Sequence, residues 1–532
     1  MGSLLAGLLL ASSLAPRPLR AAERLELRLD GLQLPIDLRD LESWSRNPGH
    51  PQGDLGAWLD LLDPSQRLAL LGLLRAPLVR DRSLAQQLLD SWAGQRLLNA
   101  LGAVLTTEQG NAAPALHRAL VELLARQEQV STIELLRALP HQRLSLNLDG
   151  LLELADGWRQ QLRSQQQALR ALRRLPLPQG APLLSLTDGL ALARGQSGGL
   201  APSTAVAQIV ELPVAHRPAP LRLQLWRPAQ PLPQAPWLLL TPGLGGSSNQ
   251  LAWYAAALRD RGWPVVLLEH PGSDAVALRD WLAGRRQPPA AETLVDRLLD
   301  LQAVVAAVQD GRLPRLGDSV VLVGHSLGSL TSLLAAGLRP EPGLQRRCDR
   351  ALAAVPLTNL SQLLQCQLPH VPLPPVKPLA QPLVAVVSLN GFGSLLWPHQ
   401  GLAELRVPAL LLGGSLDLIT PPLSEQLGLF QPAIHPRSRL VLLEGGSHFS
   451  PVRIVAGDRA VFQLGQELVG VDPARIQAMI LSLSSDFLQR QLRPGSGPLP
   501  AQRRQLGGVS ASVLDQPAAL RWRQAMQAEA GR

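Results

Sequence analysis

The stretch 319–338, SVVLVGHSLGSLTSLLAAGL, decides how this sequence is expected to fold. It opens with an apolar run that is typical of a strand buried on both faces of a sheet. The uncharged run after Ser326 favours a buried helix, and the glycines at 324 and 328 indicate a tight turn between the two. The stretch is long enough to span a membrane, but the polar His325 and Ser326 in its middle favour strand, turn and helix. A serine at such a turn projects its hydroxyl from the sheet, so Ser326 is a candidate nucleophile.

Short apolar runs like this strand recur from residue 205 onward, with helical stretches between most of them. The first two runs are separated by turn-forming residues and predict a hairpin. The later ones predict parallel strands buried on both faces. We therefore expect an α/β fold with a mostly parallel eight-stranded sheet flanked by helices. The eight runs are 206–212, 221–226, 237–241, 264–269, 319–324, 383–388, 409–413 and 440–444.

A serine nucleophile needs a general base, and the base needs an acid that orients it. In a fold of this kind the three residues follow in the order serine, acid, histidine, and the histidine comes after the last strand. Among ten histidines, only His448 follows a late strand within a loop of small residues. Asp417 is the only acidic residue in the loop after the preceding strand. Ser326, Asp417 and His448 are therefore the predicted catalytic residues, acting through an acyl-enzyme.

The oxyanion that forms during acyl transfer needs two backbone N–H donors. Leu327, directly after the serine, is expected to supply one. Leu244, in the glycine-rich loop 242–247 after the third strand, is expected to supply the other. An alternative takes this loop as a dinucleotide-binding turn, with Glu269 as the ribose-binding acid. Ser248 stands where that motif needs its third glycine, so the oxyanion interpretation is favoured.

Composition excludes several classes of protein. The 532-residue chain has 46% apolar and 17% charged residues, a globular balance that excludes wholesale disorder. Its net charge of +9 invites a nucleic-acid partner, but the arginines are scattered and only 3% of residues are aromatic. Because no basic stripe is interleaved with stacking aromatics, we expect no nucleic acid. Neither H-E-x-x-H nor C-x-x-C occurs in the sequence, so we expect no metal and no cofactor.

The rest of the chain divides into several segments. Residues 1–22 contain a short apolar core followed by small residues, which favours a signal peptide although its basic start is missing. Residues 23–150 are leucine-rich at helical spacing, so we expect an all-helical domain whose opening piece, 25–38, is more extended. Segment 151–204 is interpreted as an amphipathic helix, packed on a neighbour rather than on a membrane, with a linker. Residues 491–532 are interpreted as a C-terminal tail.

Residues 205–490 are expected to form one domain, within which the proline-rich segment 339–381 is interpreted as a cap over the site. Both cysteines of the chain, Cys348 and Cys366, lie in this segment. Export to the periplasm or another extracytoplasmic compartment is the favoured localisation, with the cytoplasm as the alternative. Export would allow a disulfide between the two cysteines, although two unpaired buried thiols are the simpler expectation.

Over residues 205–490 these motifs resemble the α/β-hydrolase family. More narrowly, they resemble its platelet-activating-factor acetylhydrolase and dienelactone-hydrolase-like branch. Residues before 150 resemble, in their leucine-rich helical pattern, the helical N-terminal domain of unknown function found in a group of cyanobacterial α/β hydrolases. Two positions depart from the branch, since Pro242 replaces a common histidine and Ser326 replaces the cysteine nucleophile of dienelactone hydrolases. The resembling pieces are 242–246, 269–273, 324–328, 417–422 and 446–450.

The resemblance implies a serine esterase, lipase-like, that cleaves carboxylic esters, including the lipid esters of lipid catabolism. The expected partner is a small-molecule ester. The sequence leaves open peripheral contact with a membrane and the oligomeric state. Two alternatives remain, namely a thioesterase or acyltransferase that uses the same site, and a non-catalytic interaction protein that retains the fold.

Overall fold

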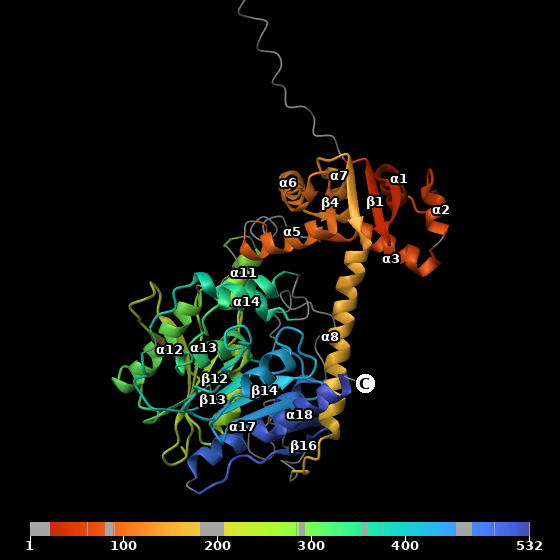
Figure 1. Ribbon diagram of the computed structural model, residues 1–532. Helices are drawn as coiled ribbons and strands as arrows, with labels where there is room; N and C mark the ends of the chain where they lie inside the picture. Colours follow the sequence, from red (N-terminus) through yellow and green to blue (C-terminus); the bar gives the residue numbers. More distant parts are fainter. Residues whose placement is uncertain are drawn as a thin grey trace, which may run out of the picture. The chain divides into compact units, whose positions relative to one another are not determined.

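The computed structural model divides the chain into two compact units, one up to Asp156 and one from Gly157 onward (Figure 1). No helix among the described residues is long and apolar enough to cross a membrane. The expected signal peptide, apart from Ala22, and most of the expected linker lie outside the described residues. The structure describes residues 22–530 except for 61, 80–88, 90, 181–206, 284, 287–292, 354–358, 376, 454–470 and 494.

The first unit is built around a five-stranded sheet of order β2-β1-β7-β4-β5. Strands β1 (Arg24–Leu29) and β2 (Leu32–Asp37) form an antiparallel hairpin, and β7 (Arg143–Asn147) pairs in parallel with β1. The expectation of an all-helical domain is therefore wrong. Strand β7, the second partner of β1, lies more than 100 residues away along the chain, so no local pattern of residues indicates this pairing.

The helices of the first unit bury a leucine-rich core against this sheet. Leucines of α1, α6 and α7 lie in one cluster with Leu25 of β1 and Leu144 of β7. The remaining elements of the unit are β3 (Pro77–Val79), β4 (Leu105–Thr107), β5 (Gly110–Asn111), β6 (Val130–Ser131), α1 (Leu38–Arg46), α2 (Leu55–Asp60), α3 (Pro64–Arg75), α5 (Trp92–Val104), α6 (Ala113–Leu124) and α7 (Thr132–Ala138).

The second unit contains a ten-stranded sheet of order β16-β17-β15-β14-β13-β12-β10-β11-β9-β8. All eight expected strands are present, the first two pair as the expected hairpin, and strands β10 to β15 are parallel. The strands are β8 (Gln208–Leu212), β9 (Leu221–Trp226), β10 (Trp237–Thr241), β11 (Val265–Leu268), β12 (Val320–His325), β13 (Leu383–Leu389), β14 (Ala409–Gly414), β15 (Arg439–Leu443), β16 (Gln502–Leu506) and β17 (Val509–Leu514).

Helices cover the sheet, which explains why its central strands are continuous apolar runs. Alternate residues such as Leu238, Leu240, Val321 and Val323 lie in one core cluster with residues of α10 and α17. The other residues of the same strands are also buried, and α13 packs on β10, β12 and β13. The helices concerned are α10 (Ala252–Arg259), α11 (Ala275–Leu282), α12 (Thr293–Gln309), α13 (Leu327–Ala335) and α17 (Pro473–Leu492).

The C-terminal residues belong to the sheet, so their interpretation as a tail is wrong. Strand β17 pairs antiparallel with β15, and β16 pairs with β17. Gly507 and Gly508, both of positive φ, make the two-residue turn between them. Two glycines between short strands are a recognised hairpin signal, and this signal was available in the sequence.

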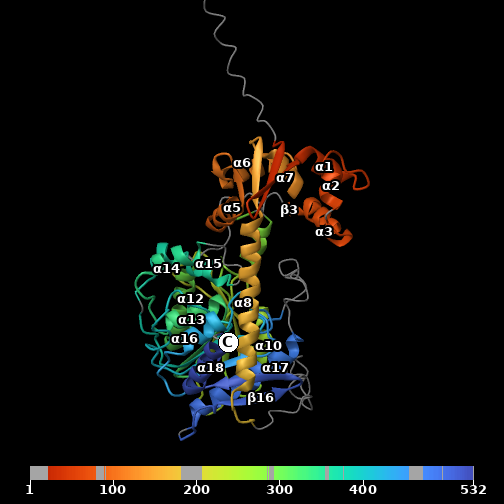
Figure 2. The ribbon, with the colours of Figure 1, turned by 45° about the vertical axis from the view of Figure 1, so that its right-hand side comes forward.

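The amphipathic helix of the sequence is α8 (Leu148–Arg174), which begins a few residues earlier than expected. Its last turns pack within the second unit beside the C-terminal helix α18 (Gln516–Ala530) (Figures 1 and 2). There the indole of the buried Trp522 donates to the Ala168 carbonyl at 2.8 Å. Arg173 also forms an ion pair with Glu444.

The proline-rich segment 339–381 contains α14 (Leu344–Ala351), α15 (Ser361–Gln365) and the short 3₁₀ helix η2 (Leu368–His370). Cys348 and Cys366 form a disulfide with their Cα atoms 5.3 Å apart, so the expectation of free thiols is wrong. The buried Glu425 accepts hydrogen bonds from Asn359 and Ser361 of the segment. It lies on the π-helix η3 (Leu423–Leu427), which is followed by α16 (Gly428–Phe430).

Candidate active site

Ser326 occupies a strained turn between β12 and α13. Its backbone has φ 53° and ψ −118°, a region that a residue with a side chain rarely adopts. A methyl group added to Gly324 would lie 2.2 Å from the Gly328 carbonyl oxygen. One added to Gly328 would lie 2.2 Å from the Thr241 carbonyl oxygen. Only glycine fits these two positions, which explains their spacing around the serine.

The structure brings together Ser326, His448 and Asp417, which come from three different loops. His448 Nε2 lies 3.0 Å from Ser326 Oγ, and His448 Nδ1 lies 2.9 Å from Asp417 Oδ2. All three side chains are buried. The serine hydroxyl can therefore donate to the imidazole, whose other nitrogen donates to the carboxylate. This is the arrangement of a serine nucleophile, a general base and an orienting acid.

Asp417 is fully buried and, within the part of the chain that the structure describes, has no arginine or lysine partner, so hydrogen bonds satisfy its oxygens. Oδ1 accepts the backbone N–H groups of Ile419 and Thr420 at 2.9 and 2.7 Å. Oδ2 accepts the Thr420 hydroxyl at 2.7 Å in addition to His448. Residues of its own loop therefore fix the carboxylate, independently of its contact with His448.

Asn390 connects the loops of the site, and sequence analysis did not identify it. Its amide nitrogen donates to the carbonyls of Ser447 and His448 at 3.1 and 3.0 Å, and its amide oxygen accepts from Gly414 N–H. Asn390 has φ 48°, a conformation that asparagine tolerates better than most residues. The signal in the sequence was an Asn-Gly pair directly after a strand.

His325, between Gly324 and Ser326, contacts His448. Its Nε2 donates to the His448 carbonyl at 2.9 Å, and the two rings lie 5.0 Å apart. Burial, reinforced by the nearby His448, lowers the pKa of His325 to about 3. His325 is therefore neutral at physiological pH, and its ring packs against the ring of His448.

The loop 242–247, which holds the predicted oxyanion donor Leu244, lies against Ser326. A methyl group on Gly243 would come 3.1 Å from Ser326 Cβ. The N–H groups of Gly245 and Gly246 donate to the Ser273 and Gly243 carbonyls. Within the described residues, the N–H groups of Leu244 and Leu327 have no backbone or side-chain acceptor. Both are therefore available to a substrate oxygen.

Glu269 and His270, which follow β11, have structural partners. Glu269 accepts the Ser248 N–H and hydroxyl at 3.0 and 2.9 Å, which occupies the side chain assigned to a ribose in the dinucleotide alternative. His270 Nδ1 donates to Asp300 and its Nε2 accepts from the Thr241 hydroxyl, both at 2.8 Å. Burial and the neighbouring cation Arg297 lower the pKa of His270 to about 4, so the ring is neutral.

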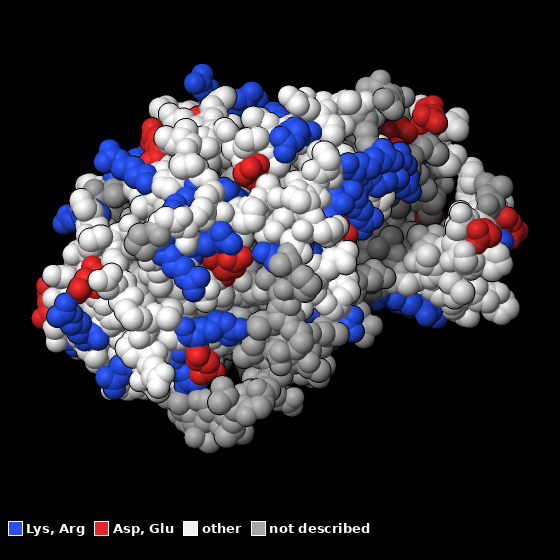
Figure 3. All heavy atoms as spheres, turned by 90° about the horizontal axis from the view of Figure 1, so that it is seen from below, with Lys and Arg blue, Asp and Glu red and all other residues white. Residues whose placement is uncertain are grey.

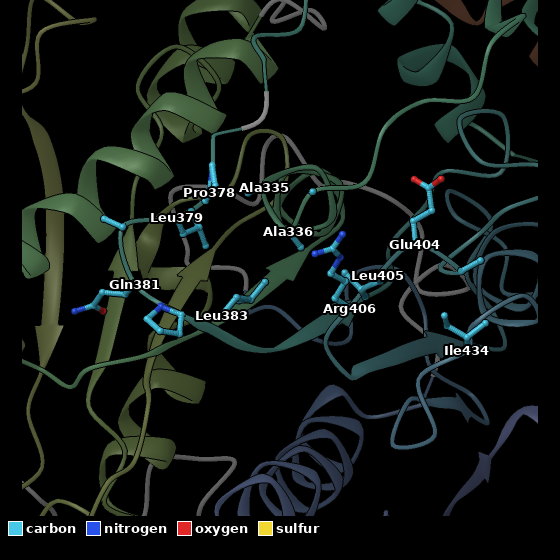
Figure 4. Close-up of a pocket in the computed structure, with 14 residues that line it drawn as sticks. Ala335, Ala336, Pro378, Leu379, Gln381, Leu383, Glu404, Leu405, Arg406 and Ile434 are labelled. Carbon is cyan, nitrogen blue, oxygen red and sulfur yellow. The ribbon is translucent and has the colours of Figure 1, made fainter.

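A cavity of about 950 Å³ opens at the other edge of the sheet (Figure 4). Leu383, at the beginning of β13, lines it together with Arg406, which precedes β14. Because parallel strands begin at one edge and end at the other, this cavity is remote from Ser326. Among the described residues, no group of three or more His, Cys, Asp or Glu side chains is placed to hold a metal ion.

Two family models match the chain, and the fold of the second unit is the α/β-hydrolase fold. A model described as an α/β hydrolase of unknown function (DUF1400) matches residues 21–147. A model described as the α/β hydrolase family matches residues 237–457, which include Ser326, Asp417 and His448. The chain therefore carries α/β-hydrolase domains, and hydrolase activity is supported. A search of curated proteins found no relative that matches this chain.

Proposed function

We propose that this protein is a serine esterase that hydrolyses carboxylic esters, including acyl esters of lipids, through Ser326, His448 and Asp417. The observation that carries the proposal is the pair of hydrogen bonds from Ser326 to His448 and from His448 to Asp417. The strained backbone of Ser326 supports it, because strain of this kind is retained at functional turns. The narrower likeness to platelet-activating-factor acetylhydrolases is part of the proposal and rests on the sequence motifs alone.

In the proposed mechanism Ser326 Oγ attacks the ester carbonyl carbon while His448 Nε2 takes the hydroxyl proton. Asp417 holds the imidazole in the required tautomer and stabilises its charged form. The carbonyl oxygen becomes an oxyanion that accepts from the N–H groups of Leu244 and Leu327. His448 then gives its proton to the leaving alcohol, and the acyl group stays on Ser326. Water, deprotonated by His448, attacks the acyl-enzyme and releases the carboxylic acid and the free serine.

The experiment that tests the proposal is turnover of chromogenic esters of graded acyl length, with fluorophosphonate labelling of the folded protein. We expect Ser326→Ala to lower turnover by roughly 10⁴-fold or more and to abolish labelling, because the mutant cannot form the acyl-enzyme. Ser510→Ala, in β17, is the control and should keep both. Near-normal turnover by folded Ser326→Ala would end the proposal. Faster reaction with acyl thioesters, or acyl transfer to an added alcohol, would instead favour the thioesterase or acyltransferase alternative.

We also propose that the protein acts outside the cytoplasm, as the sequence of residues 1–22 suggested. The disulfide between Cys348 and Cys366 supports this, because such bonds persist in oxidising compartments. Native protein from its own host should contain no alkylatable thiol until it is reduced. Reduction should lower the free energy of unfolding by about 3 kcal/mol, since the bridge closes a loop of moderate length. Two free thiols in the native material would contradict the proposal.

The proposed substrate is a small molecule, and nucleic acid is not part of the proposal. On the face of the molecule drawn in Figure 3, lysine and arginine side chains lie in separate groups, with acidic side chains beside several of them. Binding of labelled duplex and single-stranded DNA at physiological salt tests this directly. We expect no saturable binding.

A further inference from the structure

Arg297 is a buried cation that the mechanism above does not use. It lies on α12 and its side chain is fully buried. Its two terminal nitrogens donate to the carbonyls of Pro242 and Gly243 at 2.8 and 2.9 Å. Its Nε donates to the Ser273 hydroxyl at 2.8 Å. The guanidinium therefore binds the loop that carries Leu244, at the two carbonyls that precede that residue.

Among the described residues, no carboxylate forms a hydrogen bond or ion pair with Arg297. Two acids act on its charge. Asp274 accepts the Ala277 N–H at its Oδ1, and Asp300 lies one helical turn further along α12, where other groups occupy its oxygens. Arg217 binds both oxygens at 2.6 and 2.7 Å, His216 binds Oδ1, and His270 binds Oδ2. Burial lowers the pKa of Arg297 to about 9, so the group still carries its charge at neutral pH. Its charge and its hydrogen bonds are thus directed at the loop carbonyls.

The direction of the Leu244 N–H follows from the planarity of the peptide bond. The Gly243 carbonyl and the Leu244 N–H belong to one peptide group, and no cis peptide occurs among the described residues. In a trans peptide the C=O and N–H bonds point in opposite directions. Since the Gly243 oxygen points at Arg297, the Leu244 N–H points away from Arg297. Gly243 itself lies against Ser326 Cβ.

We infer that Arg297 is a positioning residue that holds the Gly243–Leu244 peptide so that the Leu244 N–H faces the oxyanion. The positive charge on the oxygen side of this peptide also polarises it and makes the N–H a stronger donor. Ser273 completes the arrangement, because its carbonyl accepts from Gly245 N–H while its hydroxyl accepts from Arg297. The inference deepens the proposed function and rests on it.

The test compares an oxygen ester with the corresponding thionoester in Arg297→Met and Arg297→Lys. Sulfur is a larger and weaker acceptor than oxygen, so a thionoester gains little from a correctly oriented N–H donor. We expect Arg297→Met to lower kcat for the oxygen ester about 100-fold, as the loss of one oxyanion donor does, with KM within about threefold. The thionoester rate should fall by less than about fivefold. Arg297→Lys should recover part of the oxygen-ester rate, because lysine can still bind one carbonyl.

Arg439→Met provides a matched control. Arg439 is also buried and also donates to backbone carbonyls, those of Pro436, Ser438 and Leu499, but it lies at the beginning of β15, at the edge of the sheet remote from Ser326. Its loss should lower the melting temperature without changing the ester-to-thionoester ratio. An equal fall in the rates for the ester and the thionoester in Arg297→Met would overturn the inference, because a general loss of folded protein lowers both rates alike.

A milder variant keeps the inference testable if Arg297→Met does not fold. Ser273→Ala removes the acceptor of Arg297 Nε and leaves every backbone contact in place. We expect a fall in the ester-to-thionoester ratio of about fivefold, and an unchanged ratio in folded Ser273→Ala would overturn the inference. Failure of the proposed function would give a different result from failure of this inference. If the proposed function were wrong, the Ser326→Ala variant would hydrolyse the ester at the wild-type rate.

Discussion

The carboxylate of Asp417 is fixed by its own loop, and this decides what its replacement should do. Three donors from Ile419 and Thr420 hold it, so an asparagine can keep one oxygen in place and turn its amide towards His448. The imidazole would then accept at Nδ1 and present a proton to Ser326, which is the wrong tautomer for a base. We expect Asp417→Asn to lower kcat about 10⁴-fold with little change in melting temperature.

Steady-state ester hydrolysis checks this prediction, with circular dichroism as the measure of folding. Asp318→Asn is the matched control, since its side chain is 82% exposed and forms an ion pair with the exposed Arg315. The control should keep wild-type kcat. A fall of less than tenfold in Asp417→Asn would remove this residue from the proposed triad.

Motifs and chain order indicated Ser326, Asp417 and His448, but they did not indicate the residues that bind the loops around them. Asn390 and Arg297 donate hydrogen bonds to backbone carbonyls of loops that are distant in the sequence. A carbonyl has no side-chain signature, so nothing in the sequence marks it as the partner of a particular asparagine or arginine. Thr420 lay in the segment 417–422 noted in the sequence, but only the structure showed that its hydroxyl donates to the Asp417 carboxylate.

The turn between β12 and α13 is the element whose geometry depends most on particular residues. Gly324→Ala would place a methyl group 2.2 Å from the Gly328 carbonyl oxygen, on backbone that cannot yield without moving the helix. We expect a loss of about 3 kcal/mol in the free energy of unfolding, as in other overpacked cores, and the loss of ester turnover. Urea unfolding and the ester assay measure the two effects.

Gly428→Ala is the control for this prediction. Nothing lies within 4 Å of the methyl group it would add, and its φ of −60° is open to any residue. It should be neutral or slightly stabilising, because alanine costs less backbone entropy than glycine. If Gly324→Ala were as stable as this control, steric exclusion would not explain the glycine at position 324.

At the scale of the whole molecule, two buried neutral histidines predict a dependence of stability on pH. Burial, with the nearby Arg297, lowers the pKa of His270 to about 4, and burial, with the nearby His448, lowers that of His325 to about 3. An unfolded histidine titrates near 6.5, so the unfolded state binds protons first as the pH falls. The free energy of unfolding should therefore decrease from about pH 6.5 down to pH 4, by several kcal/mol at about 1.4 kcal/mol per pKa unit.

Urea unfolding at pH 7, 5.5 and 4.5 measures this decrease. Burial alone would raise the pKa of Asp300, but hydrogen bonds from His270 and Arg217 lower it to about 2, so this carboxylate stays charged across the range. His270→Gln should make the decrease shallower, because glutamine does not titrate and retains a donor for Asp300. A slope unchanged by this substitution would show that His270 is not the group responsible.

The sequence by itself determined the parts of the fold that have a local pattern of residues. Short runs of strand-forming residues indicated all eight strands from β8 to β15. The later runs were continuously apolar, because strands buried on both faces exclude polar residues. The glycines around Ser326 indicated the turn, because no side chain fits there. Chain order then indicated which acid and which histidine would meet the serine, since the carboxyl ends of parallel strands share one edge of the sheet.

Only the tertiary structure decided the rest, because the partners concerned are far apart in the chain and interact through backbone groups. The sheet of the first unit joins β1 to β7, and the C-terminal hairpin extends the main sheet beyond β15. The disulfide depends on the 5.3 Å between two Cα atoms, which spacing in the sequence does not fix. The contact of Arg297 with the loop 242–247 depends on how α12 packs in the second unit, where it contacts α13, and no local pattern of residues encodes that packing.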